Sequence, residues 1–459
     1  MLWTVVKKEL WINLTSLRFS VSVFILVALV IASLVVSSKE YTEQLRDYEN
    51  KVKLHKAFAK HNNITLDRRP PKLSLLFRGV VGNVGSSVEL TVGETPELKE
   101  SSDENLLSPL FPPVDLGFVL GMVMSLMAFF LTYDAILGER ERGTLKLILS
   151  NQVPRSTVLL GKWIGGYLTL LVALIIATSV GLTVLELNIR PGFARDDWIA
   201  LGTIGLTVLI YLATFCSLGI MVSATTRSSA TAILALLLIW VLSVLVVPSL
   251  SPRIAAAIIE APSPQKIAAE KRVAKSERFE RAKKRHAVAS ARAEAEHWTD
   301  ERIANAAWWI DASEAKRYKD EMMKLERELD NAVRRQVRLS HILSYISPYG
   351  CFSTAVPRLA GTGIESHWRF LEAARRFDSA YFEAFYRFTE NRAKDISEVK
   401  LSLGKWWWPK PERVPQFRFE EEGITERVAG VLSEIVVLVV YAVLFFMISY
   451  LRFLRYDVR

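Results

Sequence analysis

The sequence predicts a mainly α-helical integral membrane protein with six transmembrane helices, a small β-containing insertion and a large helical insertion. Of its 459 residues, 51% are hydrophobic and only 23% are charged. The mean hydropathy is +0.21, and the apolar residues are concentrated in long uncharged runs. Because a run of about 18 residues or more can cross a bilayer as a helix, a plain soluble enzyme is excluded.

Charge and cysteine content restrict the partners less sharply. The formal net charge of +10 does not identify a partner, because membrane proteins collect Lys and Arg on their cytoplasmic side; we expect no nucleic acid. Cys216 and Cys351 lie far apart in the sequence, and the six histidines are scattered. We therefore expect no disulfide and no metal site.

Six apolar runs account for the predicted membrane helices. They are residues 19–37, 115–133, 163–185, 198–226, 228–250 and 431–451. Lys and Arg are frequent in the N-terminal segment, between the second and third runs and in the C-terminal tail. By the positive-inside rule, residues 1–18, 134–162 and 452–459 are expected in the cytoplasm, and so are both termini.

The first of two long segments on the opposite side comprises residues 38–114. Lys39 to about His61 is typical of a polar continuation of the first membrane helix. Leu73–Val80 and Val88–Val92 are apolar runs separated by Gly and Ser, a pattern that predicts two strands joined by a turn.

The second long segment, residues 251–430, is predicted to be mostly helical. No Gly or Pro occurs between Pro264 and Pro348, and a single straight helix of that length would extend for about 120 Å. We therefore expect a hairpin that reverses at Trp308–Asp311, where Asp311 suits an N-cap.

The returning arm carries residues spaced three and four apart, which predict an antiparallel coiled-coil seam. These residues are Met322, Leu325, Leu329, Ala332, Gln336, Leu339 and Leu343. An aromatic-rich helix is expected from about Ile364 to Asp395. The following cluster Trp406–Trp408 is expected either at the outer membrane face or in a small domain core, with equal weight.

The most specific segment lies between the second and third apolar runs. Tyr133–Leu145 reads Tyr-Asp-Ala-Ile-Leu-Gly-Glu-Arg-Glu-Arg-Gly-Thr-Leu. Alternating charges leave the membrane, Gly143 permits a sharp turn, and Thr144–Leu149 can form a short amphipathic helix on the membrane surface. The simpler alternative is an ordinary charged loop.

This segment resembles the membrane subunit of ABC transporters of the ABC-2 type. In that family Tyr-Asp-x-Ile-x-x-Glu-Arg-Glu-x-Gly-Thr-Leu is characteristic, followed by Ser-x-x-Val-x-Arg and by Gly-Lys, which here are Ser150–Arg155 and Gly161-Lys162. Together with Arg69–Gly79 and Leu359–Leu371, these motifs are similar to a branch of bacterial permeases with large extracytoplasmic insertions. That branch is often labelled as permeases for multicopper enzyme maturation.

The resemblance implies a complex in the bacterial inner membrane. Its expected partners are two copies of an ATP-binding ABC subunit, a second permease copy or paralogue, membrane lipids and an extracytoplasmic protein. It also implies a coupling helix at Thr144–Ser150, with these ATPase-coupling residues: Glu139, Arg140, Glu141, Gly143, Thr144 and Leu145.

The N-terminal stretch fits the interfacial helix of the same family. Its expected apolar side consists of Trp3, Val6, Leu10, Leu14 and Leu17. The alternative is that this stretch merely flanks the first membrane helix.

The chain itself is not expected to be an enzyme. No Gly-x-x-x-x-Gly-Lys-Ser/Thr motif occurs, so the chain has no P-loop to hold nucleotide phosphates. We expect no catalytic residues and no cofactor in this chain. ATP and Mg would belong to the partner subunit.

Two further sets of residues are candidates for contacts. One set shares a helical face of the second run and is expected to line a translocation path or, with greater weight, a dimer interface: Met122, Ser125, Phe129 and Thr132. The other is a basic patch that suits an anionic partner or lipid headgroups, with a solvated helix surface as the more ordinary alternative: Lys271, Arg272, Lys275, Arg278, Arg281 and Lys284.

ATP-driven export of an unidentified substrate is the leading functional hypothesis. The alternative is mechanotransmission, in which ATP hydrolysis moves the outer region to act on an extracytoplasmic partner or lipoprotein without transport. A third hypothesis, a membrane scaffold unrelated to ABC transporters, leaves the Tyr133–Leu145 motif unexplained.

Overall fold

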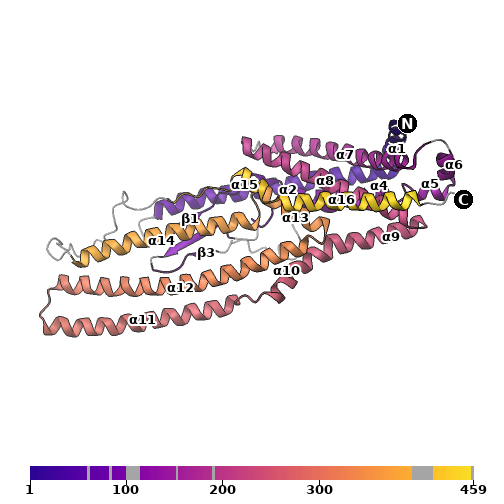
Figure 1. The fold of residues 1–459 in the computed structure, drawn as a ribbon. Coiled ribbons are helices and arrows are strands. Elements are labelled where there is room, and N and C mark those ends of the chain that lie inside the picture. Colours follow the sequence, from indigo (N-terminus) through magenta and orange to yellow (C-terminus); the bar gives the residue numbers. More distant parts are fainter. Residues whose placement is uncertain are drawn as a thin grey trace.

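The structure, a computed structural model, describes residues 1–58, 63–81, 85–91, 93–99, 114–150, 153–188, 192–394 and 417–455. The predicted Trp406–Trp408 cluster lies outside these residues. The molecule is elongated, and both chain termini lie at one end, which we call the terminal end (Figure 1). At the opposite end, which we call the distal end, the chain reverses direction between α11 (Pro264–Ala295) and α12 (Asp300–Ser344).

Six helical stretches are long and apolar enough to cross a membrane, which confirms the predicted fold class. The single-helix spans are α2 (Leu17–Phe58), α7 (Arg155–Asn188), α8 (Arg195–Thr225) and α16 (Leu432–Leu454). The second span combines α3 (Leu116–Phe118), η2 (Val119–Val123) and α4 (Met124–Thr132). The fifth combines α9 (Ser229–Trp240), η3 (Val241–Val246) and α10 (Val247–Ile258).

The second and fifth spans each contain a π-helical segment, η2 and η3. A π-helical turn replaces the normal i→i+4 hydrogen bonds and leaves a carbonyl that needs another partner. In η2 the Tyr211 hydroxyl donates to the Gly121 carbonyl at 2.6 Å. In η3 the Ser347 hydroxyl donates to the Ser243 carbonyl at 2.5 Å.

The first insertion continues α2 and adds a small antiparallel sheet. Its strands are β1 (Asn63–Asp67), β2 (Ser87–Thr91) and β3 (Glu97–Lys99), in the order β1-β2-β3. The strand prediction for Val88–Val92 agrees with β2.

The strand prediction for Leu73–Val80 is wrong. This run begins with the 3-10 helix η1 (Lys72–Leu75), and the Leu76 and Phe77 N–H groups both donate to the Leu73 carbonyl. The side chains of Leu73, Leu75, Leu76 and Phe77 are all buried. Because the buried side chains of Leu75, Leu76 and Phe77 occupy consecutive positions rather than alternate ones, the run packs as a buried turn and not as a strand with one polar face.

The second insertion consists of α11, α12, α13 (Pro348–Leu359), α14 (Ile364–Lys394) and α15 (Ile424–Ala429). The predicted reversal at Trp308–Asp311 is wrong, because these residues lie inside α12. The chain turns instead at Glu296–Thr299, where His297 has a φ of 49°. The Thr299 side chain accepts from the Arg302 N–H, and the acidic Asp300 and Glu301 follow in the first turn of α12.

Ion pairs hold the long helices of this insertion together. The helix α12 lies between α11 and α14 (Figure 1). On one side, Lys271 of α11 contacts Glu326 of α12 at 2.7 Å. On the other, the almost fully buried Lys319 of α12 contacts Asp378 of α14 at 2.8 Å. Of the predicted coiled-coil seam, Met322 and Ala332 are buried; a true coiled coil stays a prediction.

The sheet packs against α14 through a separate small core. Leu66, Val88 and Leu90 of the strands contact Phe370 and Ala374 of α14. Next to this core, burial and the positive charge of Arg68 lower the pKa of the His367 imidazole from 6.5 to about 4. The folded protein therefore keeps this ring neutral.

The second insertion should lose stability as the pH falls from 6.5 to about 4. Over this range the unfolded chain binds a proton at His367 and the folded chain does not, so protonation favours unfolding. The melting temperature of the purified chain, followed by tryptophan fluorescence, should fall more steeply with decreasing pH in the wild type than in His367→Gln. The half-exposed His341 provides the matched control, His341→Gln. Identical pH profiles for the wild type and His367→Gln would contradict this expectation.

Candidate functional site

The conspicuous feature of the terminal end is a lysine buried inside a membrane span. The side chain of Lys162 in α7 is 2% exposed. Its ammonium contacts Glu9 of α1 (Leu2–Leu14) at 2.9 Å and Glu139 of α5 (Leu137–Glu141) at 3.0 Å. Glu139 also contacts Lys8 at 3.1 Å. These four residues, the Lys162 cluster, join α1, α5 and α7.

The Lys162 cluster balances two cations against two carboxylates. An isolated charge is expensive to bury, and removal of one member from a buried pair typically costs about 3–5 kcal/mol because the remaining charge is left uncompensated. The ammonium of Lys162 is therefore a strong constraint on where α1 and α5 can lie relative to α7.

Two glycines let α1 approach α7 closely enough for this contact. A Cβ on Gly161 would lie 2.6 Å from Val5 Cγ1, and a Cβ on Gly165 would lie 2.6 Å from Glu9 Cβ. Small residues four apart on a helix are a common way to bring two helices together in membranes. The contact buries Val6, whereas Trp3 of α1 is exposed, and so is Leu17, which the prediction assigned to the same side but which begins α2. The predicted apolar side of this helix is therefore only partly buried.

The segment after the second span is held in place by hydrogen bonds to other spans. The N–H groups of Ile136 and Leu137, at the start of α5, both donate to the Ser223 hydroxyl of α8. At the end of α5, Glu141 accepts from the N–H and the hydroxyl of Ser229 at 2.7 and 2.8 Å. Glu141 thereby binds the first turn of α9.

The predicted surface helix is present as α6 (Thr144–Ser150). Gly143, with a φ of 71°, makes the sharp turn between α5 and α6 that a residue with a Cβ would strain. The Thr144 hydroxyl donates to the Glu139 carbonyl at 3.2 Å. Leu145 is buried in the span core, whereas Leu147 is 67% exposed. The helix is thus anchored on one side and presents the other outward.

The six predicted coupling residues are therefore brought together at the terminal end. Arg140, the remaining one of the six, donates to the Thr226 carbonyl at the end of α8 at 3.4 Å. Sequence reasoning did not name Glu9, Lys162, Ser223 or Ser229 as site residues, although Gly161-Lys162 belongs to the family motif quoted above. A signal existed for two of them: Lys162 is a lone cation at the start of an apolar run, and Glu9 is a lone acid in a basic segment.

The predicted face of the second span is packed inside one chain in this conformation. Ser125, Phe129 and Thr132 are buried, and Met122 is half-buried. The Trp240 indole donates to Ser125 at 2.9 Å, Phe129 packs against Phe215, and Thr132 fits against Gly219. Three of the four side chains of this face are thus buried within the chain itself, and a translocation path or a dimer interface at this face stays a prediction.

The predicted basic patch on α11 pairs largely with its own chain. Lys275 contacts Glu94 at 2.7 Å, and Arg281 contacts Glu314 at 3.1 Å. Arg278 donates to the Gly93 carbonyl at 3.3 Å, and Lys271 contacts Glu326 as described above. Only Arg272 and Lys284 of the predicted set are exposed without an ion pair to a described residue. Neither an open anionic-partner patch nor a fully solvated surface describes this helix.

In the part of the chain that the structure describes, no group of three or more His, Cys, Asp or Glu side chains is arranged to hold a metal ion. Cys216 and Cys351 are both buried free thiols.

Comparison with known proteins gives one match along the whole chain and two local ones. The sequence model of a family described as "ABC-2 family transporter protein" matches residues 3–458. The chain is 44% identical over 61 residues to the probable ABC transporter permease protein NosY of Stutzerimonas stutzeri, which is 13% of this chain and 22% of that protein. It is 46% identical over 66 residues to NosY of Pseudomonas aeruginosa, 14% of this chain and 24% of that protein. The chain thus spans less than a quarter of these relatives.

The close packing of α1 on α7 can be tested by adding a side chain at Gly165. We expect Gly165→Val to separate the helices, because its Cβ would overlap Glu9, and overpacking typically costs about 1–3 kcal/mol. The melting temperature should fall, and trypsin should cleave faster after Lys7 and Lys8. Gly202→Val is the control, since nothing lies within 4 Å of a Cβ there. Equal behaviour of the two variants would refute the packing argument.

Proposed function

Because the chain belongs to the ABC-2 family of transporter proteins, we propose that it is the permease subunit of an ATP-driven exporter whose ATP hydrolysis is performed by a separate ATP-binding subunit. Two such subunits would dock at the terminal end, which would face the cytoplasm of a bacterial cell. A second permease copy or paralogue would complete the complex.

The observation that carries this proposal is the connection between α6 and three spans. The surface helix α6 presents Leu147 outward and buries Leu145 in the span core. The preceding α5 is bound to α7 through Glu139 and Lys162, and to α9 through Glu141 and Ser229. A push on α6 by a docked subunit would therefore reach the second, third and fifth spans together.

A second candidate function, mechanotransmission to an extracytoplasmic partner, is favoured by α13. This helix of the second insertion is buried among the spans, with Cys351, Phe352 and Ala355 at most 2% exposed. It contacts both π-helical segments, η2 and η3. A Cβ on Gly121 of η2 would lie only 2.7 Å from the Tyr349 ring. Movement of the second and fifth spans would thus displace α13 and the long helices joined to it.

These two candidates differ in whether a solute crosses the membrane. In proteoliposomes that contain the whole complex, ATP-dependent loss of a solute would support export. ATP-dependent movement between the distal end and the spans, measured with paired spin labels and without solute loss, would instead support mechanotransmission.

Neutralisation of Glu139 should uncouple ATP hydrolysis from the permease. Glu139→Gln keeps the side-chain size but leaves Lys162 with Glu9 as its only carboxylate partner in the cluster. We expect the permease-stimulated ATPase rate to fall about fivefold or more, the effect of a coupling free energy of 1–3 kcal/mol, while the complex still assembles. Glu186→Gln, an exposed change near the other end of α7, is the control. Full stimulation in the Glu139 variant would count against this coupling route.

A further inference from the structure

The last span, α16, is a continuous helix. Its 23 residues extend for about 35 Å at 1.5 Å per residue. It contains no Gly, Pro or π-helical segment, whereas the second and fifth spans are interrupted by η2 and η3. In Figure 1, α16 extends from the C-terminus at the terminal end to α13 and α15. A displacement of one end of this helix would therefore reach the other end.

The inner end of α16 is bound to the segment that follows the surface helix α6. The Arg155 guanidinium donates to the Leu454 carbonyl at 2.5 Å. Leu454 is the last residue of α16, and Arg155 is the first residue of α7. The last carbonyls of a helix lack partners within the helix, so a cation is favourable there. This contact gives a partner to the arginine of the Ser-x-x-Val-x-Arg motif.

The outer half of α16 holds the turn between α12 and α13. The Tyr441 hydroxyl lies 2.9 Å from the carbonyls of both Tyr345 and Ile346. Because a hydroxyl has one hydrogen, it donates to the two carbonyls as one shared bond. The Tyr345 hydroxyl in turn donates to the Ser433 hydroxyl at 3.1 Å. The end of α12 is thus bound to α16 at two places about two turns apart.

The end of α13 and the short helix α15 are joined by two arginines that reach in opposite directions. Arg358 of α13 donates to the Gly430 carbonyl, just before α16, at 2.7 Å. Arg427 of α15 reaches back to Gly361, just after α13. A Cβ on Gly361 would lie 2.7 Å from an Arg427 nitrogen, and a Cβ on Gly430 would overlap the Arg358 guanidinium. Each glycine therefore leaves room for the guanidinium of the other element.

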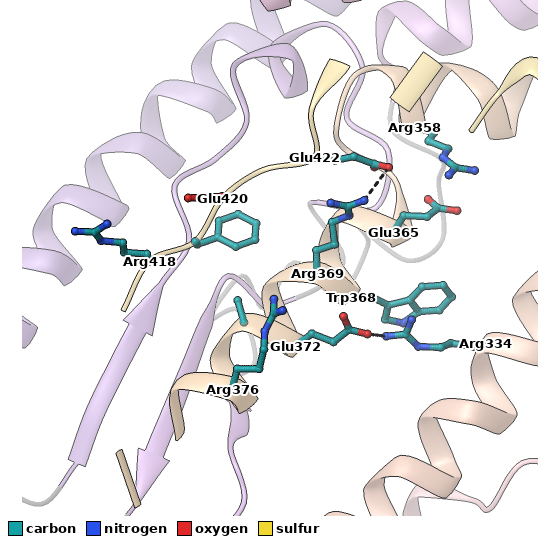
Figure 2. A pocket seen from close by; sticks show the side chains of 12 residues that line it. Arg334, Arg358, Glu365, Trp368, Arg369, Glu372, Arg376, Arg418, Glu420 and Glu422 are labelled. Carbon is teal, nitrogen blue, oxygen red and sulfur yellow. Dashed lines mark hydrogen bonds and ion pairs between the residues drawn. The ribbon is translucent and has the colours of Figure 1, made fainter. Parts of the chain in front are cut away.

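The first turns of α14 are bound to the same region. Arg369 of α14 contacts Glu422 at 3.2 Å and Glu426 of α15 at 2.6 Å. Figure 2 shows Arg358 and Arg369 in the lining of one cavity, with Arg369 joined to Glu422. The ends of α12, α13 and α14 are therefore all connected to the outer end of α16. We call the connecting residues Tyr441, Arg358, Arg427 and Arg369 the outer clasp.

The fifth span, which enters the second insertion from the other side, is less suited to transmit a displacement. It contains η3 and two prolines, Pro248 and Pro252, and such features bend helices. Residues 259–263, between α10 and α11, are not helical and include Pro262. Although α10 packs beside α12, α16 is the uninterrupted connection.

We propose that α16 is a rod that transmits a displacement of α6 to the second insertion. Arg155 holds its inner end, and the outer clasp binds its outer end to α12, α13 and α14. The proposal rests on the permease function proposed above and adds the route by which movement reaches the insertion. Arg155 and the clasp residues are positioning residues, because they act through α16.

The test compares two chemically matched variants of the full chain. Tyr441→Phe/Arg358→Gln removes two contacts of the outer clasp. Tyr450→Phe/Arg335→Gln is the control, with one change on α16 and one on α12. Neither control side chain forms a hydrogen bond or ion pair with a described residue. Melting temperatures establish that both variants are folded, and Tyr441→Phe alone replaces the clasp variant if that variant unfolds.

Spin labels at Leu187→Cys on α7 and Val273→Cys on α11 report the distance between the third span and the second insertion. Both positions are exposed, and the native cysteines are buried. The distances are measured in the chain alone and in the complex with the ATP-binding subunit, with and without ATP. The permease-stimulated ATPase rate is measured on the same samples.

We expect ATP to shift the label distance in the wild-type complex and in the control. In the clasp variant the shifted population should be about fivefold smaller, since the loss of a hydrogen bond typically changes an equilibrium by about that factor. Its ATPase stimulation should be unchanged. No shift in a wild-type complex that does stimulate the ATPase, or equal shifts in both variants, would overturn the proposal.

The chain alone separates failure of this proposal from failure of the permease function. A wild-type chain that does not stimulate the ATPase would contradict that function and not the role of α16. In that case the role of α16 is decided without ATP, where the distribution of label distances should be broader in the clasp variant than in the control. Equal widths would overturn the proposal.

Discussion

The arrangement of helices at the terminal end of the molecule depends on the ion pairs of the buried Lys162 ammonium group. A charge in this position is tolerated only where carboxylates and a close helix contact surround it. Glu9 and Glu139 supply the carboxylates from two different elements, and Gly161 and Gly165 supply the space. One side chain thereby fixes α1, the α5–α6 turn and the third span in a single arrangement.

The same principle organises the second insertion on a larger scale. The helix α12 carries charged residues on the face toward α11 and on the face toward α14. On each face they form ion pairs with the neighbouring helix. Glu314 and Glu326 meet the cations of α11, and Lys319 meets Asp378 of α14. Since pairs with little solvent exposure require precise geometry, the three helices are held as a defined unit. That unit connects to the spans through α13, whose apolar side chains pack among them.

The sequence predicts those parts of this fold that depend on local pattern. The six spans follow from uncharged length, and α6 follows from Gly143 and the charges before it. Contacts between distant residues are not encoded in this way. Glu94 and Glu314, the partners of Lys275 and Arg281, lie far away along the chain. A patch that the sequence suggests to be open is therefore mostly paired within the chain. The prediction of where the hairpin reverses was wrong for a different reason. Asp311 and Thr299 are both suitable N-caps, and only packing distinguishes them.

The central claim, that α6 receives the motion of an ATP-binding subunit, is tested most directly by cross-linking. Both native cysteines are buried, so a single introduced cysteine reports alone. Leu147 is 67% exposed on α6, and Leu187 is 80% exposed at the other end of α7. A bifunctional thiol reagent should join Leu147→Cys, but not Leu187→Cys, to a cysteine-bearing ATP-binding subunit. Absence of the Leu147→Cys product, or an equal yield from Leu187→Cys, would contradict the claim.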